Sequence, residues 1–260
     1  MKRLIAVLIA GFALLPRQAE SQPPLHRLRL RVGVEASENG AHEMLFSRTA
    51  AHVSAGVIFD PSIIPQIEGT VFADIGETSI TTADASLDEI LDRTPSISIG
   101  GTLRLVLLEF STRSRLGIEA TYLQMVGQNG FNVTKLVLPS STPIAERAMW
   151  DRASFTARSW QMEGFVFWEF DPWKNLSLRP NVGVEQFHGE LCTAFPTGAT
   201  VALPALAKDE GCRTLSHTAL IAGAGTELKL SPHWGITLDL ASTVAQSPLL
   251  FFTALLEFSI

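Results

Sequence analysis

The chain is short of the residue types that mark several common classes of protein. Its 260 residues include only two cysteines, one tyrosine and six histidines. The histidines show no metal-binding spacing such as HxxxH or HxH, so we predict neither a metal site nor a cofactor. The stretch AGAGTEL at 222–228 lacks the third glycine of a dinucleotide-binding fingerprint. A formal net charge of −6 argues against a nucleic-acid partner.

Beyond its first residues the sequence also lacks any uncharged apolar run long enough for a transmembrane helix. The apolar run at 4–15 has only twelve residues and follows Lys2 and Arg3, as in a secretory signal peptide. Small residues at Ala19 and Ser21 predict cleavage before Gln22. We therefore expect a signal peptide at 1–21 and one exported domain at 22–260. An uncleaved anchor helix is the alternative.

The two cysteines, Cys192 and Cys212, are an even pair in a chain expected to be exported. Such a pair predicts a disulfide in an oxidising compartment. It would close a loop of about 20 residues, worth roughly 3 kcal/mol in the loop-entropy model.

What the sequence does have is alternation of apolar and polar residues with a period of two. In LRLRVGVEA (28–36), leucine and valine fall on one face, while arginine, glycine and glutamate fall on the other. The segments RLGIEATY (115–122), LSLRPNVGVE (176–185) and WGITLDLAS (234–242) repeat the pattern. Such alternation predicts β-strands with one apolar face.

The alternating segments predict an all-β fold of eight to ten antiparallel strands in an up-and-down barrel. The expected strands are 27–36, 50–59, 66–75, 97–110, 115–126, 155–170, 175–187, 214–230, 234–245 and 250–260. The count falls to eight if 50–75 is not a hairpin. Short turns are expected at 60–62, 111–114, 171–175 and 231–233, and long polar connections at 37–49, 76–95, 127–154 and 188–213.

The apolar faces could point inward, as in a soluble lipocalin-like barrel, or outward into a membrane. Most of the expected strands reach the 9–11 residues that a membrane strand needs. The polar faces carry glycine, serine and threonine among the charges, which suits a crowded lumen. Aromatic residues gather near the short turns, where an interfacial girdle would lie: Phe110, Trp168, Phe170, Trp173, Trp234 and Phe258. We therefore expect a transmembrane barrel.

The chain ends in FFTALLEFSI, an alternating segment that would pair with the first strand and leave no open edge. With the signal peptide and the alternating connections, this ending resembles the small Gram-negative outer-membrane β-barrel proteins of the OmpA/OmpW-like superfamily. Thr253, Phe258 and Ile260 match the C-terminal pattern of that family, whereas Leu255 stands where glycine is usual. The resemblance implies an outer-membrane location, contact with outer-membrane lipid and lipopolysaccharide, and insertion by the assembly machinery through Phe258 and Ile260.

Charged residues of both signs fall on the predicted lumen face, where unpaired charge is costly. The expected network comprises Arg29, Arg31, Glu35, Arg104, Arg115, Glu119, Glu163, Arg179, Glu185, Glu227, Lys229, Asp239 and Glu257. It could form a plug, because barrels of this size are just wide enough to be filled by side chains. It could also line a narrow path for ions or small solutes.

Enzymatic interpretations have little sequence support. Ser216 and His217 are adjacent, but strand neighbours face opposite sides and cannot form a dyad. His217 could meet Ser159 or Glu163 across the lumen, although no triad motif accompanies it. The unusually apolar loop at 188–213 could contact a partner, cover the barrel mouth or admit a hydrophobic solute. We expect a non-enzymatic envelope or surface-interaction protein, with a narrow conduit as the alternative and a lipid-modifying enzyme third.

Overall fold

The computed structural model describes residues 26–41, 44–59, 66–84, 87–126, 131–133, 136–137, 143–199, 211–244 and 249–260. The predicted signal peptide and the predicted turn at 60–62 lie outside these residues, so both stay predictions. No helix among the described residues is long and apolar enough to cross a membrane.

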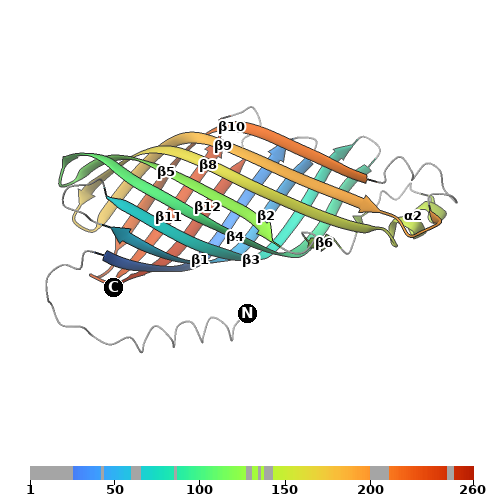
Figure 1. Ribbon diagram of the computed structural model, residues 1–260, viewed down its shortest axis with the longest axis horizontal. Coiled ribbons are helices and arrows are strands. Elements are labelled where there is room, and N and C mark those ends of the chain that lie inside the picture. The colour runs from blue at the N-terminus through green and yellow to red at the C-terminus, as the bar shows by residue number, and fades with distance from the viewer. Residues whose placement is uncertain are drawn as a thin grey trace.

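Ten antiparallel strands form a closed up-and-down barrel (Figure 1). The wall strands are β1 (His26–Ala41), β2 (Met44–Phe59), β3 (Ile67–Asp84), β4 (Leu87–Ser111), β5 (Ser114–Val126), β8 (Ser154–Trp173), β9 (Leu176–Ala194), β10 (Gly211–Lys229), β11 (Trp234–Thr243) and β12 (Leu250–Ser259). Three short elements lie in the connection between β5 and β8: β6 (Phe131–Val133), β7 (Leu136–Val137) and α2 (Ile144–Trp150). The segment at 50–75 is thus a wall hairpin, which gives ten strands rather than eight.

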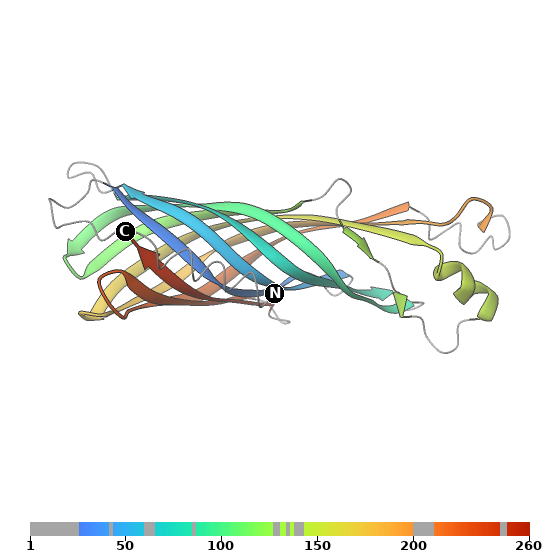
Figure 2. The same cartoon turned by 90° about the horizontal axis from the view of Figure 1, so that it is seen from below.

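Pairing of β1 with β12 closes the barrel, as the C-terminal sequence predicts. The register runs from Arg29 opposite Ser259 to Ser37 opposite Phe251. Backbone hydrogen bonds between Leu28 and Ile260 extend the pairing to the last residue. β1 begins and β12 ends at the end of the barrel that carries the short turns (Figures 1 and 2).

Two of the expected long connections are instead continuations of strands. β1 and β2 stay paired out to Ala41 opposite Met44, and β3 and β4 out to Asp84 opposite Leu87. The predictions of loops at 37–49 and 76–95 were therefore wrong. The polar residues that suggested loops belong to the lumen face, where Ser37, Thr78 and Ser96 are buried. Short and long connections do not simply alternate.

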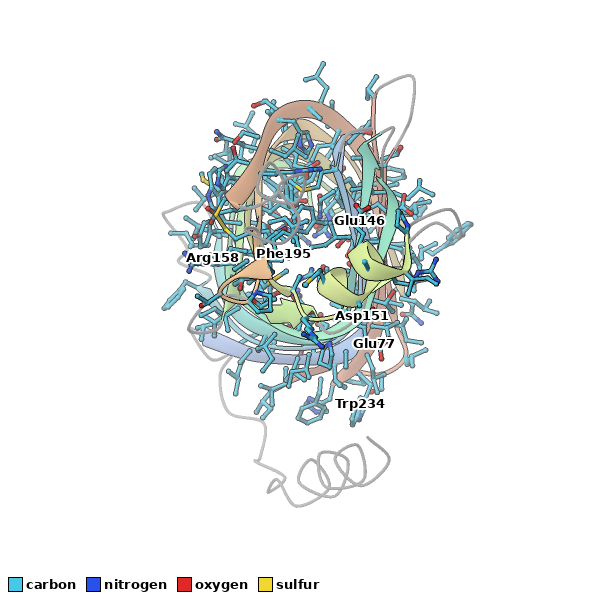
Figure 3. All side chains as sticks on the ribbon, turned by 90° about the vertical axis from the view of Figure 1, so that its right-hand side faces the viewer. Glu77, Glu146, Asp151, Arg158, Phe195 and Trp234 are labelled. Atoms are coloured by element: carbon cyan, nitrogen blue, oxygen red, sulfur yellow. A yellow bond between two sulfur atoms is a disulfide. The ribbon has the colours of Figure 1, made fainter. Side chains whose placement is uncertain are left out.

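The apolar faces of the strands point outward, as a membrane barrel requires. Exposed valine, leucine and isoleucine occur around the wall, whereas the alternate residues turn inward. Aromatic side chains gather near the short turns, where Trp234 packs on Phe258 with ring centroids 4.8 Å apart. In Figure 3 Trp234 points away from the barrel. The chain has the fold of a small outer-membrane β-barrel.

Candidate functional site

The lumen near the short turns is crossed by ion pairs that join β1, β3 and β12. Arg31 Nη2 lies 2.8 Å from Glu68 Oε1, and Arg31 Nε lies 2.9 Å from Glu257 Oε2. Arg29 approaches the same two carboxylates, with distances of 3.5 Å to Glu68 and 3.2 Å to Glu257. The two arginines and two glutamates are mostly buried and balance one another across the closing seam.

Further arginines extend this layer around the lumen. Arg104 pairs with Glu169 and places its guanidinium 4.5 Å from the ring centroid of Phe167. Arg115 Nη1 lies 3.5 Å from the Glu169 carboxylate. Sequence alternation placed both arginines in the lumen but did not single out Glu169 as their shared partner.

Arg179 crosses from β9 toward two acidic residues on other strands. Its Nη2 lies 2.8 Å from Asp239 Oδ1, and its Nη1 lies 3.6 Å from Glu119 Oε2. These three predicted network residues are therefore brought together. Glu227 and Lys229 belong to no ion pair among the described contacts and line a small recess of about 40 Å³ near the short turns.

A second charged cluster lies further along the lumen, and the sequence analysis found only one of its members, Glu35. Arg48 pairs with Glu35 and lies 3.3 Å from Asp74. His52 Nδ1 lies 2.7 Å from Asp74 Oδ1. Arg48 was missed because its segment was assigned to a loop.

This cluster contains three residue types that can bind a metal ion, since ligand atoms of Glu35, His52 and Asp74 lie within 4.8 Å of one another. The guanidinium of Arg48 contacts both carboxylates, however. It already supplies the positive charge that a metal ion would bring, so we assign no metal to this cluster.

Glu163 and Glu185, like Glu227, form no ion pair among the described contacts. They face each other on neighbouring strands β8 and β9. Glu163 accepts a hydrogen bond of 2.6 Å from Gln161. Glu185 is 0% exposed, and neither of its carboxylate oxygens has a hydrogen-bond partner among the described residues.

A polar cavity of about 220 Å³ lies among these charged clusters. Its lining includes Arg31, His52, Glu119, Glu163 and Arg179. The cavity is large enough for a few water molecules. Side chains of both signs of charge line it.

Toward the end with the longer connections the lumen becomes apolar. A buried cluster there comprises Met44, Phe46, Ile80, Met125, Ala157, Phe187, Leu191, Phe195 and Ala199. Phe46 and Phe187 pack edge to face with ring centroids 5.3 Å apart. Phe195 and Ala199 come from the segment after β9, and Figure 3 shows Phe195 within the ring of strands. Two residues of the loop predicted at 188–213, Phe195 and Ala199, are therefore part of the buried apolar cluster.

His217 faces the lumen and Ser216 the exterior, as strand geometry predicts. The ring of His217 lies 5.6 Å from that of Phe187, and neither of its nitrogens has a hydrogen-bond partner in the part of the chain that the structure describes. The expected contact with Ser159 or Glu163 is absent from the described contacts. Ser216 instead contacts His188 on the outer surface, at 2.7 Å.

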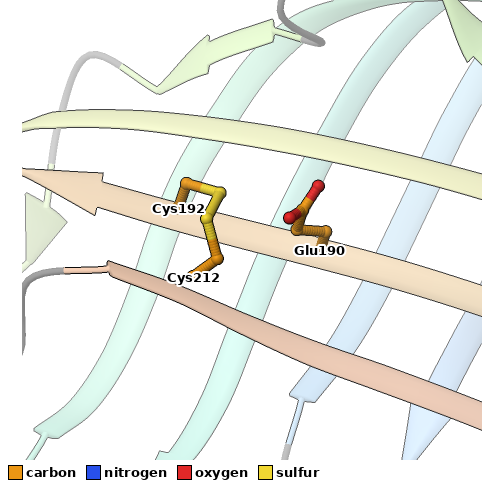
Figure 4. A group of neighbouring side chains, drawn as sticks. All are labelled: Glu190, Cys192 and Cys212. Atoms are coloured by element: carbon orange, nitrogen blue, oxygen red, sulfur yellow. A yellow bond between two sulfur atoms is a disulfide. The ribbon is translucent and has the colours of Figure 1, made fainter.

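The cysteines and the C-terminal residues have defined places. Cys192 and Cys212 are bonded and lie directly opposite each other on β9 and β10 (Figure 4). Phe258 and Ile260 lie on the outer face beside the closing seam, whereas Thr253 lines the cavity. Recognition of these C-terminal residues by the assembly machinery stays a prediction.

Comparison with known proteins shows similarity of fold alone. No family model and no curated protein matches the chain. The structure is similar to the attachment invasion locus protein Ail of Yersinia pestis, at 10% identity over 90% of this chain and 98% of that chain, with a TM-score of 0.39. It is also similar to the outer membrane protease OmpT from Escherichia coli, at 9% identity over 94% and 99%, with a TM-score of 0.49.

A third similar structure is an outer membrane channel from Pseudomonas putida F1. Its identity to this chain is 8%, the coverage is 95% of this chain and 98% of that chain, and the TM-score is 0.40. The three proteins differ in their described roles. Membership of the OmpA/OmpW-like superfamily stays a prediction.

Proposed function

We propose that this protein is a non-conducting outer-membrane barrel that works through its outer surface, in envelope structure or surface interaction. The observation that carries the proposal is the filling of the lumen at two levels. Arginine–carboxylate pairs cross it near the short turns, and the apolar cluster fills it near the mouth. A barrel of this strand number can be filled by side chains in this way.

The outer end offers the surface for interaction in this proposal. β8 and β9 extend toward α2, which lies at the end of the barrel away from the short turns (Figures 1 and 2). That end faces the cell exterior in barrels of this class. The proposed partners are outer-membrane lipid and lipopolysaccharide, a surface ligand of unspecified chemistry, and the assembly machinery during insertion.

The alternative is a narrow conduit for ions or small solutes, and the polar cavity of about 220 Å³ favours it. Single-channel conductance of the refolded, disulfide-intact protein in a planar bilayer separates the two. The proposal predicts insertion without discrete openings. Steady openings would contradict it, and Arg179→Ala and Glu119→Ala would then test whether the charged residues set ion selectivity.

A lumen variant and a control variant show whether a silent recording results from the filled lumen. Combining Phe46→Ala and Phe187→Ala with Arg31→Ala and Glu257→Ala weakens both the apolar cluster and the ion pairs, and we expect openings to appear. Trp234→Ala removes an aromatic ring that points away from the barrel. That control is expected to stay silent.

A further inference from the structure

The outer surface carries a serine and a histidine in the contact that nucleophilic catalysis uses. Ser216 on β10 lies directly opposite His188 on β9, and its Oγ is 2.7 Å from His188 Nδ1. In the Nε2–H tautomer of the histidine, the serine hydroxyl donates to Nδ1. A base within hydrogen-bond reach of a hydroxyl is the first requirement for an activated serine nucleophile. The sequence does not reveal the pair, because 28 positions separate the two residues.

The backbone N–H of Ser216 lies on the side of β10 where, among the described residues, no neighbouring strand pairs with this part of the strand. Leu220 O accepts a hydrogen bond from Val244 N, so the even-numbered residues of this part of β10 direct their N–H groups toward β11. β11 pairs with β10 only from Ile221 onward. Among the described residues no strand pairs with this edge beside Ser216. The N–H of Ser216 can therefore donate to the oxyanion that forms on the ester carbonyl oxygen when Ser216 Oγ attacks the carbonyl carbon.

The pair lies at the upper limit of the apolar outer surface. One row toward the short turns, Met162 on β8 is 50% exposed, and two rows toward them Leu220 on β10 is 59% exposed. One row corresponds to roughly 5 Å of height on a tilted strand. The ring of Trp160 stacks on His188 with centroids 5.7 Å apart, and tryptophan is enriched at membrane–water interfaces. Acyl ester groups of membrane lipids lie in this same interfacial layer.

The disulfide holds the two strands that carry the pair. Cys192 and Cys212 are opposite each other, four residues beyond His188 and Ser216 on the same outer face (Figure 4). The bond fixes the outer ends of β9 and β10 side by side. A rigid support of this kind is what keeps two reacting groups in contact.

We propose that Ser216 and His188 form an ester-hydrolysing site that acts on acyl chains of outer-leaflet lipids. Ser216 Oγ attacks the ester carbonyl carbon while its proton passes to His188 Nδ1. The lipid alcohol leaves with that proton, and the acyl group stays on Ser216. Water then attacks the acyl-serine and gives a proton to His188, and Ser216 regains it as the fatty acid leaves.

This site would give the proposed outer-surface role a specific chemical activity. It depends on the proposed function only because both require that this surface is exposed to lipid. The proposed site departs from the expectation that the protein is not an enzyme. A measurement of ester hydrolysis decides between the site and that expectation. Conductance and hydrolysis are independent readouts. Channel openings would overturn the proposed function while leaving the ester site to be judged by its own assay.

The test uses the refolded protein in vesicles of a phosphatidylcholine with ester-linked chains, with release of free fatty acid as the readout. Vesicles of the ether-linked analogue are the substrate control. We expect release from the ester lipid alone, and a fall of about 100-fold or more in Ser216→Ala and His188→Gln. His233→Gln changes another exposed histidine, which contacts the backbone oxygen of Ser259, and should retain full activity.

A second measurement tests the site directly in the wild-type protein, so that the test does not depend on the folding of the variants. A lipid-like fluorophosphonate should label the wild-type protein on the peptide that contains Ser216, as read by mass spectrometry, and His188→Gln should reduce the labelling. The proposal is overturned if the folded wild-type protein releases no fatty acid above protein-free vesicles and takes no label at Ser216. Undiminished release by folded Ser216→Ala would overturn it equally.

Discussion

At the scale of single residues, the buried acidic side chains are of two kinds. Glu257 lies between Arg29 and Arg31, so its charge is compensated. Glu185 is as deeply buried, but its carboxylate has no hydrogen-bond partner in the described segments of the chain. Burial of an unpartnered carboxylate costs free energy, whereas loss of one member of a buried ion pair exposes its partner to the same cost.

The two kinds of carboxylate predict opposite effects of the same substitution. Glu257→Gln should lower the free energy of unfolding by about 3 kcal/mol, because it leaves the two buried arginines with the single negative charge of Glu68 to share. Glu185→Gln should leave the stability unchanged or raise it. Urea unfolding in lipid vesicles measures both. Equal destabilisation by the two substitutions would show that Glu185 has a compensating partner.

At the scale of elements, closure of the barrel depends on a close approach of β1 and β12. A Cβ atom on Gly33 would collide with the backbone oxygen of Ala254 and would lie 2.8 Å from the Cα of Leu255. Gly69 on β3 has open space where its Cβ would be. The two glycines thus differ in whether a side chain can be added without moving the backbone of a neighbouring strand.

This difference predicts that Gly33→Val prevents closure, whereas Gly69→Val is tolerated. The folded fraction is measured by the shift in gel mobility between unheated and boiled samples. We expect Gly33→Val to lose most of the folded band and Gly69→Val to keep it. A normal folded band for Gly33→Val would mean that β1 and β12 can separate without loss of the barrel.

The strands were predictable where apolar and polar residues alternate strongly, as in β1 near Val32 and in β9 near Val182. Their outer ends were not, because the lumen there is lined by serine, threonine and asparagine, which also favour loops. The ion-pair partners depend on which strands face one another across the lumen. That information lies in the closed topology, so Glu68 and Asp74 could not be assigned to their arginines from sequence.

The contact between Ser216 and His188 was hidden for a related reason. It depends on the register of β9 against β10, and the disulfide between Cys192 and Cys212 lies in that same register. Once the cysteines are placed opposite each other, Ser216 falls opposite His188. A bonded pair of cysteines on neighbouring strands is therefore the sequence signal that could have located it.

At the scale of the whole molecule, the filled lumen and the apolar exterior belong to one arrangement. Charged residues that turn inward require partners inside, and apolar residues that turn outward require lipid. Polar and charged groups that can contact other molecules therefore lie at the two ends of the barrel and where the apolar outer surface ends, on the side away from the short turns. Both proposals, the surface role and the ester site, depend on this orientation.

The most direct measurement of that orientation is the accessibility of spin labels in the reconstituted protein. A label at Val182, which is 55% exposed on β9, should collide often with oxygen and rarely with a water-soluble nickel chelate. A label at Thr214, beyond the apolar surface on β10, should show the reverse. Free access of the nickel chelate to a label at Val182 would mean that the apolar outer face of the strands is in contact with water. That result would contradict a membrane-spanning barrel.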